Sequence, residues 1–121
     1  MRTIEWMGSS RGDLREFPEE VRVEIGQSLF EVQCGDTPDN AKPLVGLKEF
    51  KGAAVMEIVE RLNTDTYRAV YTTKLNDRLY VLHAFQKKAK RGNETPQRDI
   101  ELIVERLKAA REHADRLKGT K

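Results

Sequence analysis

Two segments of the chain carry hydrophobic residues at the spacing of an α-helix. In the N-terminal segment, the apolar stripe consists of Val21, Ile25, Leu29 and Val32. Pro18 suits the first turn of this helix, and Ser9 or Ser10 can cap a shorter helix before it. Residues 9–34 therefore predict an acidic helical hairpin.

The second helical stripe lies in the C-terminal segment. It consists of Ile100, Ile103, Val104, Leu107, Ala110, Ala114 and Leu117. Thr95 is expected to be the N-cap of this helix and Pro96 its first helical residue, because the first turn does not need the N–H that proline lacks. The pattern predicts one long helix that continues to the C-terminus.

Alternating or β-branched stretches predict four strands. A short strand comes first, within residues 2–7, with Ile4 and Trp6 on one face. Three longer strands follow at Val55–Leu62, Tyr67–Lys74 and Arg78–Lys87. The turns between these three are short enough for antiparallel hairpins, so we expect a meander.

The last of these strands is apolar on both faces. Leu79, Val81 and Phe85 are expected to alternate with Tyr80, Leu82 and Ala84. A strand with this pattern is typical of the interior of a sheet that is covered on both sides.

Residues 35–53 contain turn-forming residues, and their prolines and glycines indicate an irregular loop. This loop carries Lys42, Lys48 and Lys51. The expected element order is β-α-α-β-β-β-α. It predicts an α+β fold in which an N-terminal helical hairpin and a C-terminal helix pack against a small, mostly antiparallel sheet.

The chain has 121 residues, 38% of them hydrophobic, which suits one domain spanning residues 1–121. No apolar run is long enough to cross a bilayer, and no targeting segment is recognisable, so we expect no membrane partner. The single cysteine, Cys34, excludes an internal disulfide and favours a cytoplasmic location. Cys34, His83 and His113 lack the spacing of metal ligands, so no metal and no small-molecule cofactor are expected.

The net charge of +2 conceals an uneven distribution along the chain. Residues 1–40 hold four Lys or Arg against nine Asp or Glu, whereas residues 41–121 hold 18 against 11. Such a split can create one surface for an anion and another for a different partner. It can equally reflect charges that decorate solvated helices without further meaning.

A basic run lies where the last strand is expected to leave the sheet. It consists of Lys87, Lys88, Lys90 and Arg91. Side chains at a strand end are positioned better than those on a free tail, so the run can bind phosphates with Phe85 and Tyr80 nearby for packing or stacking. The alternative is a solvated basic loop.

Two further residues in the strands have two explanations each. His83 is expected on the same strand face as Val81 and Phe85, either as a core residue with satisfied hydrogen bonds or as a group that transfers a proton. Arg68 either pairs with a carboxylate such as Glu57 on the neighbouring strand or lines a basic face. Three positions further along, Tyr71 is expected on the opposite face if the strand is regular.

Several of these residues form a recognisable combination: Tyr-Arg-x-x-Tyr at residues 67–71, His-x-Phe-x-Lys-Lys at residues 83–88 and Thr-Pro at residues 95–96. This combination resembles the phage-derived, HigB-like branch of the RelE/ParE toxin superfamily of bacterial type II toxin–antitoxin modules. The resemblance covers the whole chain in element order and is strongest over residues 52–107. It implies a RelE-like fold of the microbial-ribonuclease kind.

The resemblance also implies an activity and partners. Such a toxin is a ribosome-dependent endoribonuclease that cleaves mRNA during translation, needs no metal, and promotes attack of the 2′-hydroxyl on the adjacent phosphate. Its partners would be the ribosome with its mRNA and a neutralising antitoxin, usually a helix-turn-helix protein that binds DNA.

The match carries catalytic roles onto Arg68, His83, Lys87 and Lys88. By resemblance, Arg68 would contact the phosphate or the transition state, and Lys87 and Lys88 would contact phosphate or stabilise its charge. His83 would be the candidate for proton transfer.

The expected RNA-binding residues are Lys48, Lys51, Tyr71, Phe85, Lys90 and Arg91. One position departs from the family pattern, since Val59 stands where many relatives have an arginine. Lys48 and Lys51 are expected to supply part of that missing basic face.

Two other functions fit the same residues. The gyrase-poisoning, ParE-like branch of the superfamily suggests a non-enzymatic toxin that binds a protein target, with the acidic helical hairpin as its interface. The other alternative is an inactive prophage copy that only binds its antitoxin.

Overall fold

The computed structural model describes residues 1–44, 48–50, 52–87 and 95–119. The elements in chain order are β1 (Ile4–Trp6), α1 (Ser10–Arg15), α2 (Glu19–Gln33), β2 (Ala41–Pro43), the 3-10 turn η1 (Lys48–Phe50), β3 (Met56–Leu62), β4 (Asp65–Leu75), β5 (Arg78–Lys87) and α3 (Gln97–Gly119). The α+β fold, the helical hairpin and the C-terminal helix expected from the sequence are all confirmed.

The strands form one five-stranded sheet in the order β1-β5-β4-β3-β2. The predicted meander is confirmed, because β3, β4 and β5 pair antiparallel in sequence order. β1 returns to pair parallel with β5, with Ile4 beside Leu79 and Trp6 beside Val81. β5 is therefore an interior strand between β1 and β4, as its apolar pattern predicted.

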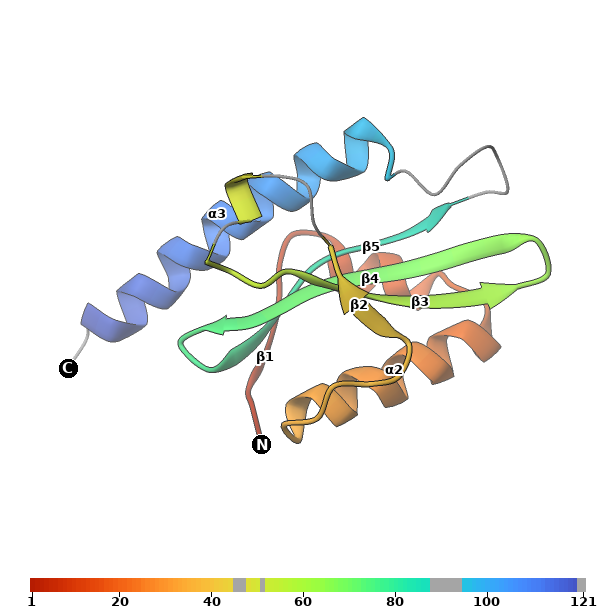
Figure 1. Ribbon diagram of the computed structural model, residues 1–121, viewed down its shortest axis with the longest axis horizontal. Coiled ribbons are helices and arrows are strands. Elements are labelled where there is room, and N and C mark those ends of the chain that lie inside the picture. Colours follow the sequence, from red (N-terminus) through yellow and green to blue (C-terminus); the bar gives the residue numbers. More distant parts are fainter. Residues whose placement is uncertain (45–47, 51, 88–94, 120–121) are drawn as a thin grey trace.

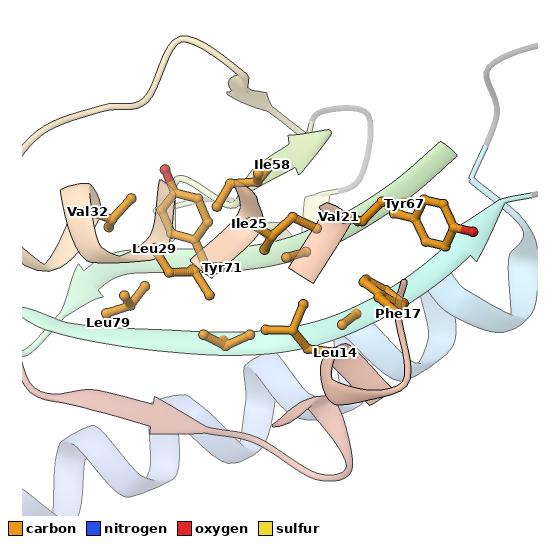
Figure 2. Packing of buried hydrophobic residues seen from close by; sticks show 13 residues of the cluster. Leu14, Phe17, Val21, Ile25, Leu29, Val32, Ile58, Tyr67, Tyr71 and Leu79 are labelled. Carbon is orange, nitrogen blue, oxygen red and sulfur yellow. The ribbon is translucent and has the colours of Figure 1, made fainter. Parts of the chain in front are cut away.

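Helices cover both faces of this sheet, α1 and α2 on one side and α3 on the other (Figure 1). The stripe of α2 packs on the first face together with Leu14 and Phe17, as Figure 2 shows. The sheet supplies Ile58, Tyr67, Ala69, Tyr71, Leu79, Val81 and Ala84 to this cluster. A helix as short as α1 is only marginally stable by itself. The hairpin is therefore stabilised by burial of the α2 stripe, Leu14 and Phe17 against the sheet.

The second face packs against α3. Its buried cluster includes Val70, Tyr80, Leu82, Phe85, Ile103, Leu107, Ala110 and Ala114. The spacing of the α3 members matches the apolar stripe read from the sequence. Pro96 rather than Thr95 takes the N-cap position, because the carbonyl of Pro96 accepts the first helical hydrogen bond, from the N–H of Ile100 at 3.1 Å.

The expected alternation along β5 is wrong beyond Val81. Tyr71 pairs with Val81 but Val70 pairs with His83, so Leu82 is an extra residue in the ladder, a β-bulge. The bulge turns Leu82 and His83 to the same side. As a result, His83 and Phe85 face α3 and no longer share a face with Val81.

The expected absence of regular structure in residues 35–53 is also wrong. Ala41–Pro43 forms the edge strand β2, paired antiparallel with β3, and Lys48–Phe50 forms the 3-10 turn. Pro43 is tolerated there because it lies at the end of a three-residue edge strand, where a missing N–H costs little.

Candidate functional site

A cleft of about 680 Å³ opens beside the second half of β5. β1 accompanies β5 only as far as Val81, so the strand edge is open from Leu82 onward. The cleft lies between this open edge, the α1–α2 connection and the first turns of α3. Residues from distant parts of the chain therefore meet here.

His83 forms one wall of the cleft and is only 4% exposed. Its Nε2 lies 2.7 Å from Oδ1 of Asp99, and Nη1 of Arg106 lies 3.0 Å from its Nδ1. A guanidinium can only donate, so Nδ1 is the acceptor and Nε2 carries the hydrogen that is donated to Asp99. The bulge at Leu82 makes this arrangement possible, because it turns His83 toward α3.

The imidazole of His83 also stacks on Phe85. The two ring centroids are 4.9 Å apart and the rings are inclined by 19°. Two hydrogen bonds and a stacked ring fix the orientation of this histidine. The geometry matches the core-histidine explanation, while proton transfer by His83 stays a prediction.

Arg106 joins three elements at the back of the cleft. Its Nη1 donates to the carbonyl of Leu82 at 3.2 Å, and its Nη2 donates to Oγ of Ser9 at 3.0 Å. The hydroxyl of Ser9 in turn donates to Asp13 at 2.7 Å. Arg106 thus ties α3 to the open edge of β5 and to the start of α1.

Gly8 makes room for this guanidinium. Its φ is +55°, and a Cβ built on it would lie 2.4 Å from Nε of Arg106. A residue with a side chain would therefore displace Arg106 as well as strain the backbone.

The charges around the cleft are of both signs. Arg98 and Arg106 supply positive charge, while Asp13, Glu16 and Asp99 supply negative charge. Arg98 is exposed at the start of α3, so its guanidinium faces solvent at the mouth of the cleft. The described lining can bind a phosphate through Arg98.

Arg68 takes the first of its two explanations, a pair with Glu57. Its Nη1 lies 2.6 Å from Oε1 of Glu57, and each side chain is 5% exposed. Within the described residues, Nε of Arg68 is buried and has no hydrogen-bond partner. The pair lies on the α3 side of the sheet, since Arg68 stands opposite Phe85 in the β4–β5 ladder.

Tyr71 lies on the opposite face from Arg68, as expected. It is 3% exposed in the cluster under α2, and this burial raises the pKa of its phenol, while Arg2 acts in the other direction. The structure therefore does not bring Tyr71 to the cleft.

The other predicted site residues are distributed as follows. Phe85 lines the cleft, Lys87 ends β5 and is half-buried, and Lys48 is exposed on η1, away from the cleft. Lys51, Lys88, Lys90 and Arg91 lie outside the described residues.

Sequence reasoning missed Arg106, Asp99, Arg98 and Ser9. A usable signal was present in α3, where Asp99 and Arg106 are seven residues apart and so lie on one side of the helix. What the sequence could not show is that a bulge turns His83 toward them.

Among the described residues, no group of three or more His, Cys, Asp or Glu could hold a metal ion. Within the same part of the chain, no helix has both the length and the apolar character to cross a membrane.

Residues 12–108, which are most of the chain, match the family described as "Phage derived protein Gp49-like (DUF891)". Comparisons with curated proteins and with solved structures gave no significant match.

Proposed function

This chain belongs to the phage-derived Gp49-like family, and we propose that it is the toxin of a type II toxin–antitoxin module that cleaves mRNA on the translating ribosome. The observation that carries this proposal is the position of the His-x-Phe-x-Lys pattern. His83 and Phe85 line the cleft beside the open edge of β5, and Lys87 follows where the strand ends. The proposal includes a helix-turn-helix antitoxin as the neutralising partner and a cytoplasmic site of action.

In the proposed reaction, the 2′-hydroxyl of one nucleotide attacks the phosphate that follows it. The bond from phosphorus to the 5′-oxygen breaks, which leaves a 2′,3′-cyclic phosphate and a free 5′-hydroxyl. One proton leaves the 2′-oxygen and one is delivered to the 5′-oxygen. Catalysis therefore needs charge stabilisation on the phosphate and two proton transfers.

Cationic side chains at the strand end would supply the charge stabilisation. By the resemblance, Lys87 and Lys88 would contact the phosphate, and Arg98 offers an exposed guanidinium at the mouth of the cleft. Removing one such group from a transition state commonly lowers a rate about 10²- to 10³-fold. His83 is the candidate for one of the proton transfers, and proton acceptance at its Nδ1 would require Arg106 to leave that atom.

The test is induced expression in bacteria, with growth and the 5′ ends of transcripts followed together. We expect growth arrest and new ends inside reading frames, and loss of both in a Lys87→Gln, Lys88→Gln variant. The matched control is Lys108→Gln with Lys118→Gln, which removes the same charge from exposed positions on α3.

Intact transcripts during growth arrest would contradict the proposal, and DNA damage with intact mRNA would favour the gyrase-directed alternative. Absence of growth arrest at full expression would favour an inactive copy. Cleavage that persists in the Lys87 and Lys88 variant would remove these lysines from the catalytic assignment.

A further inference from the structure

A second groove lies on the other side of α1, between this helix, α2 and β1. Its volume is about 410 Å³, and more of its lining is apolar than polar. The floor is formed by Ile4, Trp6, Leu14 and Leu29. Ile4 and Trp6 are only half-buried, so the groove leaves part of the first apolar cluster open to solvent.

α2 contributes Leu29 and Phe30 to the apolar part of this lining, together with the polar residues Arg22 and Gln33. Phe30 lines the groove and is 48% exposed, and Val23, seven residues earlier on the same helix, is 59% exposed. Residues seven apart lie on nearly the same side of an α-helix. Phe30 therefore adds an exposed apolar side chain to the groove, and Val23 places a second one on the same side of α2 beyond the groove lining.

Gly26 completes the part of the lining that α2 contributes. It lies in the interior of α2, where a glycine destabilises a helix relative to alanine. A Cβ built on Gly26 would meet no atom within 4 Å, so packing within the described chain does not require the glycine. Its absence of a side chain widens the groove.

Three arginines form the rim. Arg11 and Arg15 lie one turn apart on α1, and Arg22 lies across from them on α2. The described lining contains no carboxylate, and none of the three guanidiniums forms an ion pair with a described acidic residue. These are three of the four basic residues in an N-terminal segment that is otherwise acidic.

We propose that this arginine-rimmed groove binds a segment of a partner protein in which one or two bulky apolar side chains are flanked by Asp or Glu. The apolar side chains would rest on Trp6 and Leu29, and the carboxylates would meet the guanidiniums, whose fork matches a carboxylate. Charge complementarity selects this occupant over a basic or neutral segment. The groove is separate from the β5 cleft, so the inference does not depend on RNA cleavage.

The first test uses random 12-residue peptides displayed on phage and selected against the purified full chain. Selected peptides are expected to combine Leu, Phe, Trp or Ile with Asp or Glu. Their affinity is expected to fall as NaCl rises from 0.05 to 0.5 M, as screening of an exposed ionic rim requires. Failure to select any peptide, or selection of peptides without acidic residues, overturns the proposal.

The second test compares matched variants with the best selected peptide. Gly26→Gln places a side chain in the groove and is expected to weaken binding at least tenfold, while Gly12→Gln, at a helical glycine on α1 that also has open space around it, is expected to leave binding unchanged. Arg15→Gln with Arg22→Gln is expected to weaken binding about five- to tenfold, given the typical strength of exposed ion pairs. Lys108→Gln with Lys118→Gln is the control for charge.

Thermal unfolding of each variant verifies that it is folded. The arginine pair keeps the test decisive if Gly26→Gln does not fold. Equal affinity across all the folded variants overturns the proposal. So does a homodimer that Gly26→Gln dissociates, because the occupant would then be a second copy of this chain.

Discussion

The buried pair of Arg68 and Glu57 predicts that losing one partner is far more damaging than losing both. The two side chains are joined at 2.6 Å and are each 5% exposed, so removing either leaves a charge with no partner and little water. Breaking a buried ion pair in this way typically costs about 3–5 kcal/mol, whereas replacing both partners by apolar residues is often neutral. We expect this asymmetry here.

The three variants to compare are Arg68→Met, Glu57→Leu and the double variant. A domain of this size is stable by about 5–15 kcal/mol, so each single change removes a large part of the total. At roughly 4 °C per kcal/mol, each single variant should melt about 12–20 °C lower than the parent chain. The double variant is expected within about 1 kcal/mol of the parent, because Met and Leu fill much of the same volume without burying charge.

Urea unfolding at pH 7, followed by circular dichroism and by the fluorescence of Trp6, measures these free energies. A loss of less than about 1 kcal/mol in Arg68→Met would refute the reasoning, since that is the range of an exposed pair. A double variant as unstable as either single one would refute it too. The double variant also removes Nε of Arg68, which has no hydrogen-bond partner among the described residues, and this favours the small change expected for that variant.

The double variant also separates structure from catalysis. A folded double variant that still arrests growth would show that Arg68 is structural. A folded double variant that no longer arrests growth would support a catalytic role. Arg68→Ala alone cannot make this distinction, because loss of folding would have the same effect on growth.

Three other predictions follow from the contacts described above. Gly8→Ala should lower the free energy of unfolding in urea by about 1–3 kcal/mol, and clearly less in an Arg106→Ala background, where the clash with Nε is absent. Equal losses in the two backgrounds would contradict the close approach of Gly8 to Arg106. Burial raises the pKa of Tyr71, so above pH 10 the unfolded chain loses this proton before the folded chain does, and the free energy of unfolding should fall by up to about 1.4 kcal/mol per pH unit. Tyr71→Phe should reduce this fall, and the same pH dependence of stability in the variant and the parent would contradict the prediction. Asp99→Asn keeps a hydrogen-bonding group for Nε2 of His83 and should cost less than about 1 kcal/mol, whereas Asp99→Leu should cost about 1–3 kcal/mol. The reverse order would contradict the hydrogen bond between His83 and Asp99.

The secondary structure was predictable because its signals are local. Helical spacing, proline at a helix start and short turns between β-rich stretches depend on neighbouring residues, and they gave the hairpin, the meander and the C-terminal helix. The pairing of Arg68 with Glu57 was also within reach as an alternative, since adjacent antiparallel strands bring their side chains together.

The candidate site was less predictable because it depends on register and on distant contacts. A strand that is apolar on both faces fits either register, so its residues could not reveal the extra Leu82 that turns His83 toward α3. β2 was not predicted because a strand of three residues at a sheet edge is too short to show an alternation of apolar and polar side chains. Arg106 escaped because its partners are far away in the sequence, Ser9 being 97 residues distant.

The parallel pairing of β1 with β5 has a consequence for how the chain folds during synthesis. β1 has no strand to pair with until residues 79–81 have been made, and the guanidinium that closes the cleft belongs to a helix made later still. Contacts of such long sequence separation slow folding, because loop closure must precede the gain from pairing. A nascent chain that has not yet emitted α3 would lack this wall of the cleft, so the complete site should arise only after α3 has been made.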